Sequence, residues 1–371
     1  MLNRIAVLIV CVLTFVQSAS AWSSKEHIQI TRIAAEQLIA DPTTPPAMKD
    51  WLKKQIPTLT DIAGEKDYLL HKRIGANPTE FTSILKYATR PDDHAQQDPQ
   101  DSKIPVFNAH EKLMHYIDLE LFLTGDAKRE YRPDLSGRPK IDDFPHDLKD
   151  PRYVQAGYLP LRVEYCYGKL VDAIRAGRLD HTGQILEGEE DSAPRWAGYL
   201  AHYLADNTQP HHATIDYKSA TYFANKRKAP NVHAEMEYKM IDDEKNEHAE
   251  LRAEFWPLFA KALAEAPDPV DTEDLFKATL EVSMTSYGAL PMIGEAAVAA
   301  LKPNPGNKPD ELDTEVFFRH VGTYKGQKMT VMQMKANQLA WAVKRVEREL
   351  KRAWIEAQSP TTAPLAAPAG N

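Results

Sequence analysis

One stretch constrains the fold of this chain more than any other: AGYLAHYLADNTQPHHA, residues 197–213. Its apolar residues recur at helical spacing, and the helix must end near Pro210 because proline has no amide hydrogen to donate. His202 and Asp206 are four residues apart, so their side chains lie on one face of that helix, one turn apart. Two polar groups placed in this way suit two ligands of one metal ion.

Short motifs of this kind also occur by chance, and the alternative is a polar pair on a helix face followed by a solvated turn. Further potential ligands are therefore needed. His211 and His212 follow the proline, and the second of them could reach a neighbouring metal position. Histidines and carboxylates also lie close together elsewhere in the chain: His233 and Glu237, His115 and Asp118, Asp67 and His71, and Asp92, Asp93 and His94.

These groups offer imidazole and carboxylate ligands without thiolates, which is typical of catalytic zinc sites. Their number indicates more than one metal ion. Metal ions a few ångströms apart can hold a shared hydroxide and stabilise both ends of a phosphoryl displacement. The ligand types therefore favour a metal-dependent hydrolysis of phosphoesters.

Apolar periodicity of the helical kind covers most of the remaining chain, and no stretch shows the alternation typical of strands. The segments with this pattern are 30–38, 81–88, 112–122, 159–174, 193–207, 244–265, 272–286 and 326–357. Short joints rich in proline and glycine separate them, and no linker divides the chain. We expect one all-α domain of many helices over 22–357. The Ala/Pro-rich tail, 358–371, has little to bury, so we expect it to be disordered.

The first 21 residues have the features of a signal peptide. Residues 5–16 are almost wholly apolar, Arg4 precedes them, and Ala19-Ser20-Ala21 is typical of a cleavage site. The apolar run is too short to span a bilayer, and no later stretch reaches ~20 apolar residues. We expect a secreted or periplasmic protein without a transmembrane segment, and a retained signal anchor is the alternative.

Cleavage after residue 21 would remove Arg4 and no acidic residue, so the formal net charge would change from −8 to −9. Proteins that bind long nucleic acids without sequence preference normally use a basic face, which this balance argues against unless bound metal ions supply local positive charge. Cys11 would also be removed. Cys166 would then be the single cysteine, unable to form an internal disulfide, and we expect it in the core.

Five features together resemble one known superfamily: Trp22 at the new N-terminus, His27, HYID at 115–118, HxxxDxTQPxH at 202–212 and HxxxE at 233–237. This is the trinuclear-zinc superfamily of bacterial zinc-dependent phospholipase C and the single-strand-specific nucleases of fungi and plants. The resemblance runs from Trp22 to about Asp242, with a weaker helical match to 357. It implies an all-α fold, in agreement with the periodicity, and hydrolysis of phosphodiesters.

The resemblance also implies three zinc sites. The first would be formed by Asp67, His115, His202 and Asp206. The second would be formed by His212, His233 and Glu237. The third would be formed by the amine and carbonyl of Trp22, by His27 and by Asp206, which would bridge two zinc ions. A hydroxide between the bridged ions would attack phosphorus, with Asp67 as a candidate general base.

Two positions and the substrate remain open. Asp67 is preferred because LTDIAGEKD resembles an LxxIAxxxD motif of the nucleases, while Asp92 and Asp93 are nearer to His115 in the sequence. HYID also favours a nuclease, in which Tyr116 would stack on a base; the alternative is a core tyrosine. Glu237 and the missing glycine-rich insertion before the HxxxE motif instead favour a phospholipase C. The substrate is thus a phospholipid, or a single-stranded nucleic acid or nucleotide.

Two other classes of function fit the same residues. One is a metal-binding or lipid-binding protein that keeps the zinc ligands without turnover. The other is a protein whose zinc is purely structural. Structural zinc sites are usually closed by four protein ligands, whereas His212, His233 and Glu237 leave one position open. The sequence indicates no protein partner.

Overall fold

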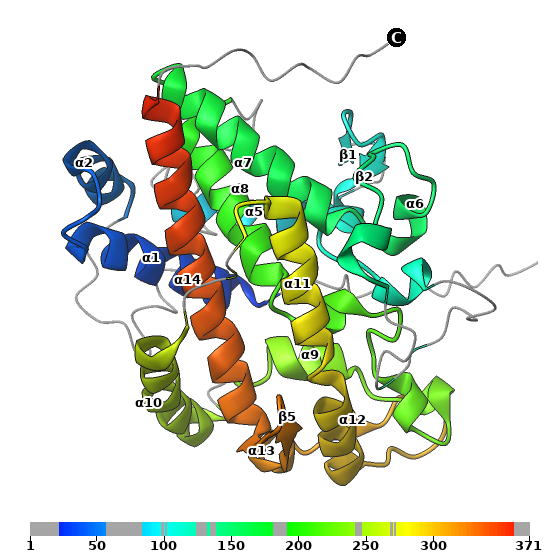
Figure 1. Cartoon of the computed structure of the whole chain (residues 1–371). Helices are drawn as coiled ribbons and strands as arrows, with labels where there is room; N and C mark the ends of the chain where they lie inside the picture. Colours follow the sequence, from blue (N-terminus) through cyan, green and yellow to red (C-terminus); the bar gives the residue numbers. More distant parts are fainter. Residues whose placement is uncertain are drawn as a thin grey trace, which may run out of the picture.

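The computed structural model describes residues 22–56, 84–97, 100, 102–123, 131, 133, 139–180, 191–241, 247–267, 270 and 272–359. Asp67, the expected signal peptide and residues 360–371 of the expected tail lie outside these ranges. The described part is mostly helical (Figure 1). No helix in it combines the length and the apolar character needed to cross a bilayer.

The α-helices lie at α1 (Ser24–Ala40), α2 (Pro46–Gln55), α4 (Ile84–Tyr87), α5 (Arg90–Ala95), α6 (Tyr153–Ala156), α7 (Leu159–Arg175), α8 (Ala193–Asp206), α9 (Val232–Glu237), α10 (Ala249–Glu265), α11 (Leu275–Tyr287), α12 (Leu290–Ala299), α13 (Thr314–Arg319) and α14 (Val331–Gln358). The 3₁₀ turns lie at η1 (Glu111–Met114), η2 (Leu119–Phe122), η3 (Ile141–Asp143), η4 (Pro210–Ala213), η5 (Ala220–Tyr222) and η6 (Lys226–Lys228).

Helix α8 lies in the interior, packed against α1, α4, α7 and α14 (Figure 1). Every residue of α8 except Arg195 is buried. A helix that is apolar on nearly all sides buries all of them, because no face gains by contact with water. His202 and Asp206 therefore lie inside the protein rather than on its surface. Cys166 on the neighbouring α7 is buried, as expected.

Gly198 lets α4 approach α8 closely. A Cβ atom at this position would lie 2.4 Å from Cβ of Tyr87 and 2.6 Å from the carbonyl oxygen of Ile84, so no larger residue fits without movement. Of the helix expected at 81–88, the structure describes residues 84–88, which contain the single turn α4. Helix α5 follows after Thr89. The close approach of α4 brings α5, which carries Asp92, to the face of α8 that carries His202.

The mostly helical structure agrees with the expected all-α class, and it also contains a few short strands that no alternation in the sequence indicated. The described residues contain three antiparallel hairpins: β1 (Lys103–Ile104) with β2 (Ala109–His110), β3 (Leu301–Lys302) with β4 (Glu311–Leu312), and β5 (Val321–Tyr324) with β6 (Gln327–Thr330). Strands of two to four residues are too short to show an alternating pattern. Lys325 and Gly326, with φ of 51° and 73°, form the turn between β5 and β6. The pattern at 326–357 thus begins as a strand, and α14 starts at Val331.

The helix expected at 112–122 is also wrong. The chain there forms η1 and η2, separated by the HYID segment at 115–118. The backbone of this segment bonds to other parts of the protein instead of continuing a helix. The amide of Ile117 donates to the carbonyl of His212 at 2.9 Å, and the amide of Asp118 donates to that of Ala156. These long-range bonds replace the local ones that an α-helix would have made.

Candidate metal centre

Two groups of buried histidines and carboxylates lie close to the C-terminal end of α8. The first donor group consists of His27, Asp92, His115, His202 and Asp206. The second donor group consists of His212, His233 and Glu237. The potential ligand atoms lie within 4.8 Å of one another in each of three triplets: His27, Asp92 and His202; His115, His202 and Asp206; and the second donor group.

Asp206 is the centre of the first donor group. Its Oδ2 atom lies 2.9 Å from Nδ1 of His115 and 3.2 Å from Nε2 of His202, and its Oδ1 atom lies 3.3 Å from Nε2 of His27. The three histidines come from α1, from the segment after η1, and from α8 itself. One carboxylate is thus approached by imidazoles from three separate parts of the chain.

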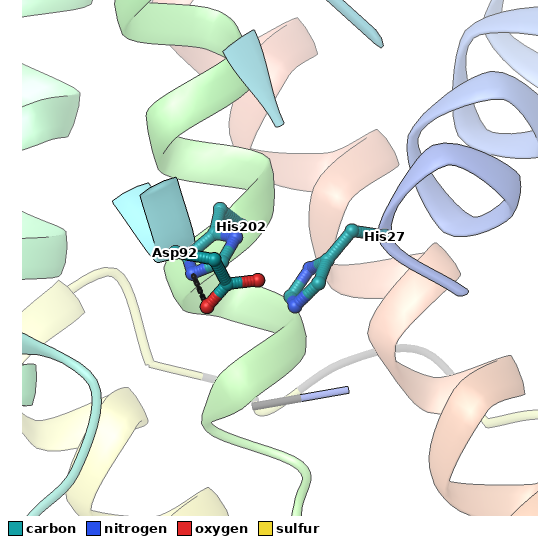
Figure 2. A group of neighbouring side chains, drawn as sticks. All are labelled: His27, Asp92 and His202. Atoms are coloured by element: carbon teal, nitrogen blue, oxygen red, sulfur yellow. Dashed lines mark ion pairs between the residues drawn. The ribbon is translucent and has the colours of Figure 1, made fainter. Parts of the chain in front are cut away.

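Asp92 joins this group from α5, and its carboxylate faces His202 across the gap between the helices (Figure 2). Its Oδ1 atom lies 3.8 Å from Nε2 of His202 and 3.8 Å from Nδ1 of His115. The side chain of Asp93, by contrast, is 45% exposed and pairs with Arg90 at 3.1 Å. The structure thus separates two aspartates that are neighbours in the sequence.

Backbone carbonyls fix the orientation of two imidazoles. Nδ1 of His202 lies 2.7 Å from the carbonyl oxygen of Ala88, and Nδ1 of His212 lies 2.6 Å from that of His115. A carbonyl only accepts hydrogen bonds, so Nδ1 carries the hydrogen in both rings. When Nδ1 carries the only ring hydrogen, Nε2 of each ring has the free lone pair, and it faces the other donors. Metal-binding histidines are commonly held by a hydrogen bond of this type.

The second donor group is built largely from one short helix. His233 and Glu237 are one turn apart on α9, and Nε2 of His233 touches Oε1 of Glu237. His212 reaches the same place from η4, with its Nε2 atom 3.8 Å from that oxygen. The side-chain amide of Gln209, which lies within the TQP turn, donates from Nε2 to Oε1 of Glu237 at 3.2 Å. The break in the helix before Pro210 therefore brings two residues to this group.

Many polar atoms of the two groups are buried without a hydrogen-bond partner among the described residues. These atoms are both ring nitrogens of His27, both carboxylate oxygens of Asp92, Nε2 of His115, Oδ1 of Asp206 and Nε2 of His233. Buried polar atoms without partners are rare because each loses its hydration without compensation. Here they are nitrogen and oxygen atoms in one small volume, and divalent metal ions are a natural partner for them. The residues therefore fit a metal centre.

The pKa values of three histidines agree with this role, whereas, in spite of its burial, the hydrogen bond and charge of Asp206 raise the pKa of His115. Burial and the neighbouring His202 lower the pKa of His27, and burial lowers that of His212 to about 4. Burial, together with His212 and His211, holds the pKa of His233 well below its usual value. Neutral imidazoles have the free lone pair that a metal ligand needs.

Burial acts in the opposite direction on a carboxylate and raises its pKa, because it disfavours the charged form. Burial raises the pKa of Asp92 to about 6, and burial with the nearby Asp92 raises that of Glu237 well above its usual value. Burial alone would also raise the pKa of Asp206, but His202, His115 and His27 hold it well below the usual value. The ionised form of each carboxylate would be stabilised by a bound cation.

The structure places the remaining predicted residues as follows. Trp22 is fully buried, and its indole Nε1 donates to the carbonyl of Ala205 at 2.9 Å and to Oγ1 of Thr208 at 3.1 Å. It is therefore held beside the end of α8 that carries Asp206. Tyr116 is half-buried, and its ring packs against Gly157. Asp67 lies outside the described residues, so its place as a ligand stays a prediction.

Two residues near the second donor group belong to neither group. His211 is buried, and its Nε2 atom lies 3.0 Å from Oγ of Ser219. Its ring centroid lies 5.3 Å from that of His233. Tyr217 is 44% exposed, with its ring edge towards His233 and a centroid distance of 6.3 Å. Nothing in the sequence singled out Tyr217 as a site residue, because one aromatic residue in a loop forms no spacing pattern.

No protein-family model matches the chain, and a search of curated proteins gave no match. The interpretation of the site therefore depends on its residues and their geometry.

Proposed function

We propose that this chain is a zinc-dependent phosphodiester hydrolase. The observation that carries the proposal is the convergence of His27, His115 and His202 on the single carboxylate of Asp206. A buried carboxylate between several imidazoles is suited to bridge two metal ions, and the unpartnered donor atoms around it support the same interpretation. The resemblance of the sequence motifs to the trinuclear-zinc superfamily agrees with this proposal.

The donor groups suggest how zinc would be held. The first site would use His115, His202, Asp206 and a second aspartate. The second site would use His212, His233 and Glu237. The third would use His27 and Asp206 with the amine and carbonyl of Trp22, once residues 1–21 have been removed. A free α-amine has a pKa of about 7.7–8.0 and so loses its proton far more readily than a lysine.

Asp92 is now the favoured aspartate of the first site. Its carboxylate lies 3.8 Å from both His115 and His202, and both of its oxygens lack hydrogen-bond partners. An aspartate with one oxygen on a metal keeps a second oxygen for a proton. Asp92 is therefore also our candidate general base, and Asp67 is the alternative for both roles.

Zinc ions held in this way supply a nucleophile at neutral pH and positive charge for the departing oxygen. The protein's own contribution is to keep the ligands in place. The carbonyls of Ala88 and His115 hold the rings of His202 and His212, and Gln209 holds Glu237. Because the lowered pKa values of His27, His212 and His233 keep these imidazoles neutral, metal binding does not first require them to lose a proton.

The substrate is a phospholipid, or a single-stranded nucleic acid or nucleotide. The exposed Tyr217 has its ring close to His233 of the second donor group, with 6.3 Å between the ring centroids, and the half-buried Tyr116 directly follows His115 in the sequence. Such rings can stack on a nucleobase or contact an acyl chain. One zinc-loaded sample should be assayed side by side on phosphatidylcholine, single-stranded DNA and RNA, and 3′-nucleotides. Lack of turnover on all of them, at full zinc content, would contradict the proposed activity.

A second candidate is a purely structural metal centre, and one observation favours it. Every residue of the two donor groups is buried, with His27, His202 and Asp206 fully inaccessible. Closed sites of this kind usually stabilise a fold. Chelation distinguishes the two candidates. Loss of activity while the helical circular dichroism signal is retained supports catalysis, whereas unfolding of a protein without activity supports a structural role.

A further inference from the structure

Lys335 on α14 is a buried lysine that lies beside the donor groups and belongs to neither. Its side chain is 0% exposed, and its Nζ atom lies 2.7 Å from Oε1 of Glu26, which is also buried. Its ammonium group also donates to the carbonyl oxygen of Met236. A buried ion pair is weak support for stability, because apolar residues of similar size often stabilise a core equally well. A functional reason for it is therefore worth seeking.

The two partners of Lys335 give such a reason. Glu26 directly precedes His27 of the first donor group in α1, and Met236 directly precedes Glu237 of the second donor group in α9. One ammonium group is thus bonded to the neighbour of a potential ligand in each group. Helices α1 and α9 lie far apart in the sequence, and this lysine joins them at the donor residues.

The same lysine is connected to the turn before α1. Oε2 of Glu26 accepts the amide hydrogen of Ser23 at 2.9 Å, while Oγ of Ser23 accepts that of Glu26 at 3.3 Å. This capping box fixes the direction in which the chain enters the helix. Nζ of Lys335 also lies 5.2 Å from the ring centroid of Trp22, within range of a cation–π interaction.

We propose that Lys335 is a positioning residue that sets the distance between the first and second donor groups, and with it the position of Trp22. The inference rests on the proposed zinc function. Its ammonium group has three hydrogens, and Glu26, the carbonyl of Met236 and the face of Trp22 surround it. Without this cation, Glu26 would be a further buried carboxylate close to the donor groups, able to compete for a metal ion.

The test is Lys335→Met, which keeps an unbranched side chain and removes the charge. The matched control is Lys351→Met on the same helix. Nζ of Lys351 lies 2.7 Å from Oδ2 of Asp41, the C-cap residue of α1, so this control breaks an α14–α1 ion pair of the same length at the other end of α1. Glu26→Gln is a second test variant that keeps the shape of the glutamate and is milder if Lys335→Met folds poorly.

Zinc binding to the metal-free proteins should be measured by titration against a competing chelator. In Lys335→Met and Glu26→Gln, the zinc affinity of the weakest site should fall by about 10- to 100-fold, as for other residues that hold ligands in place. Activity of both should rise towards wild type as zinc is added. Lys351→Met should bind zinc like the wild type, even if its melting temperature falls.

Two results would overturn the inference, and they are distinguishable. If wild type binds clustered zinc and both test variants bind it equally well, the positioning role is wrong and the proposed function stands. If wild type itself binds no zinc, the proposed function fails and the inference fails with it.

Discussion

The two donor groups are assembled in different ways. In the first, potential ligands come from α1, α5, the segment after η1 and α8. In the second, His233 and Glu237 come from a single turn of α9, and only His212 comes from elsewhere. The first group therefore depends on the packing of several elements, whereas the second depends mainly on the local geometry of one helix.

This difference has a consequence for mutation. A packing change near α8 should disturb the first donor group without reaching the second. A ligand change in the second group should leave the first in place. The hydrogen bond from Nδ1 of His212 to the carbonyl of His115 and the bonds of Lys335 connect the two groups.

The largest effect is expected from Asp206→Asn. The amide removes the charge shared by His27, His115 and His202 and binds zinc poorly, so zinc should be lost from the first group. Turnover should fall by at least about 10³-fold, because metal ions supply several kcal/mol of transition-state stabilisation. Zinc content by elemental analysis and turnover are the measurements. Asp93→Asn, at a 45% exposed side chain, is the control. Normal zinc content in Asp206→Asn would show that the bridge is misassigned.

His212→Ala should have the next largest effect and should act on the second group. It removes a ligand, so about one zinc ion per chain should be lost while the first group keeps its own. His211→Ala is the matched control, because His211 is buried beside His212, its Nε2 atom lies beside Oγ of Ser219, and only its ring packs near that of His233. Zinc content and turnover should be compared in the two variants. Equal losses would mean that the two histidines have no separate roles.

The N-terminus should affect only the first group. Protein that begins at Trp22 should be compared with protein that keeps one additional residue in front of it. The extended form has an amide instead of an amine at Trp22, so it should hold about one zinc ion fewer and turn over more slowly. His27→Ala should cause the same loss. Equal zinc content and turnover in the trimmed and extended forms would remove Trp22 from the ligands.

The smallest effect is expected from Gly198→Ala, which acts through packing alone. The new Cβ would lie 2.4 Å from that of Tyr87 and would push α4 away from α8, so the free energy of unfolding should fall by about 1–3 kcal/mol. Gly168→Ala on α7 is the control, because its Cβ would meet no atom within 4 Å. This change should raise stability by roughly 0.5–1 kcal/mol. Urea denaturation measures both variants.

In Gly198→Ala, zinc binding should weaken at the first donor group only. The movement of α4 would shift Asp92 on α5 and the carbonyl of Ala88, which holds His202. Neither contact involves α9. An equal weakening at both groups would contradict the idea that the second group is built locally.

Most of the helical character could be predicted from the sequence, because apolar residues at helical spacing report local geometry directly. The exceptions have a common cause. The segment at 112–122 and the three short hairpins are fixed by hydrogen bonds to distant backbone or by strands too short to show a pattern. Local periodicity carries no information about such partners.

The sequence by itself determined the pairs of potential ligands that lie one turn apart, His202 with Asp206 and His233 with Glu237, since this spacing on a helix fixes which face each side chain occupies. Only the tertiary structure decided that Asp92 joins the first donor group while Asp93 faces outwards, because the approach of α4 to α8 at Gly198 sets the position of α5. Only the tertiary structure placed Lys335 between Glu26 and Met236. A buried charge is tolerated only where partners surround it, and the partners of Lys335 lie about 100 and 300 residues away along the chain.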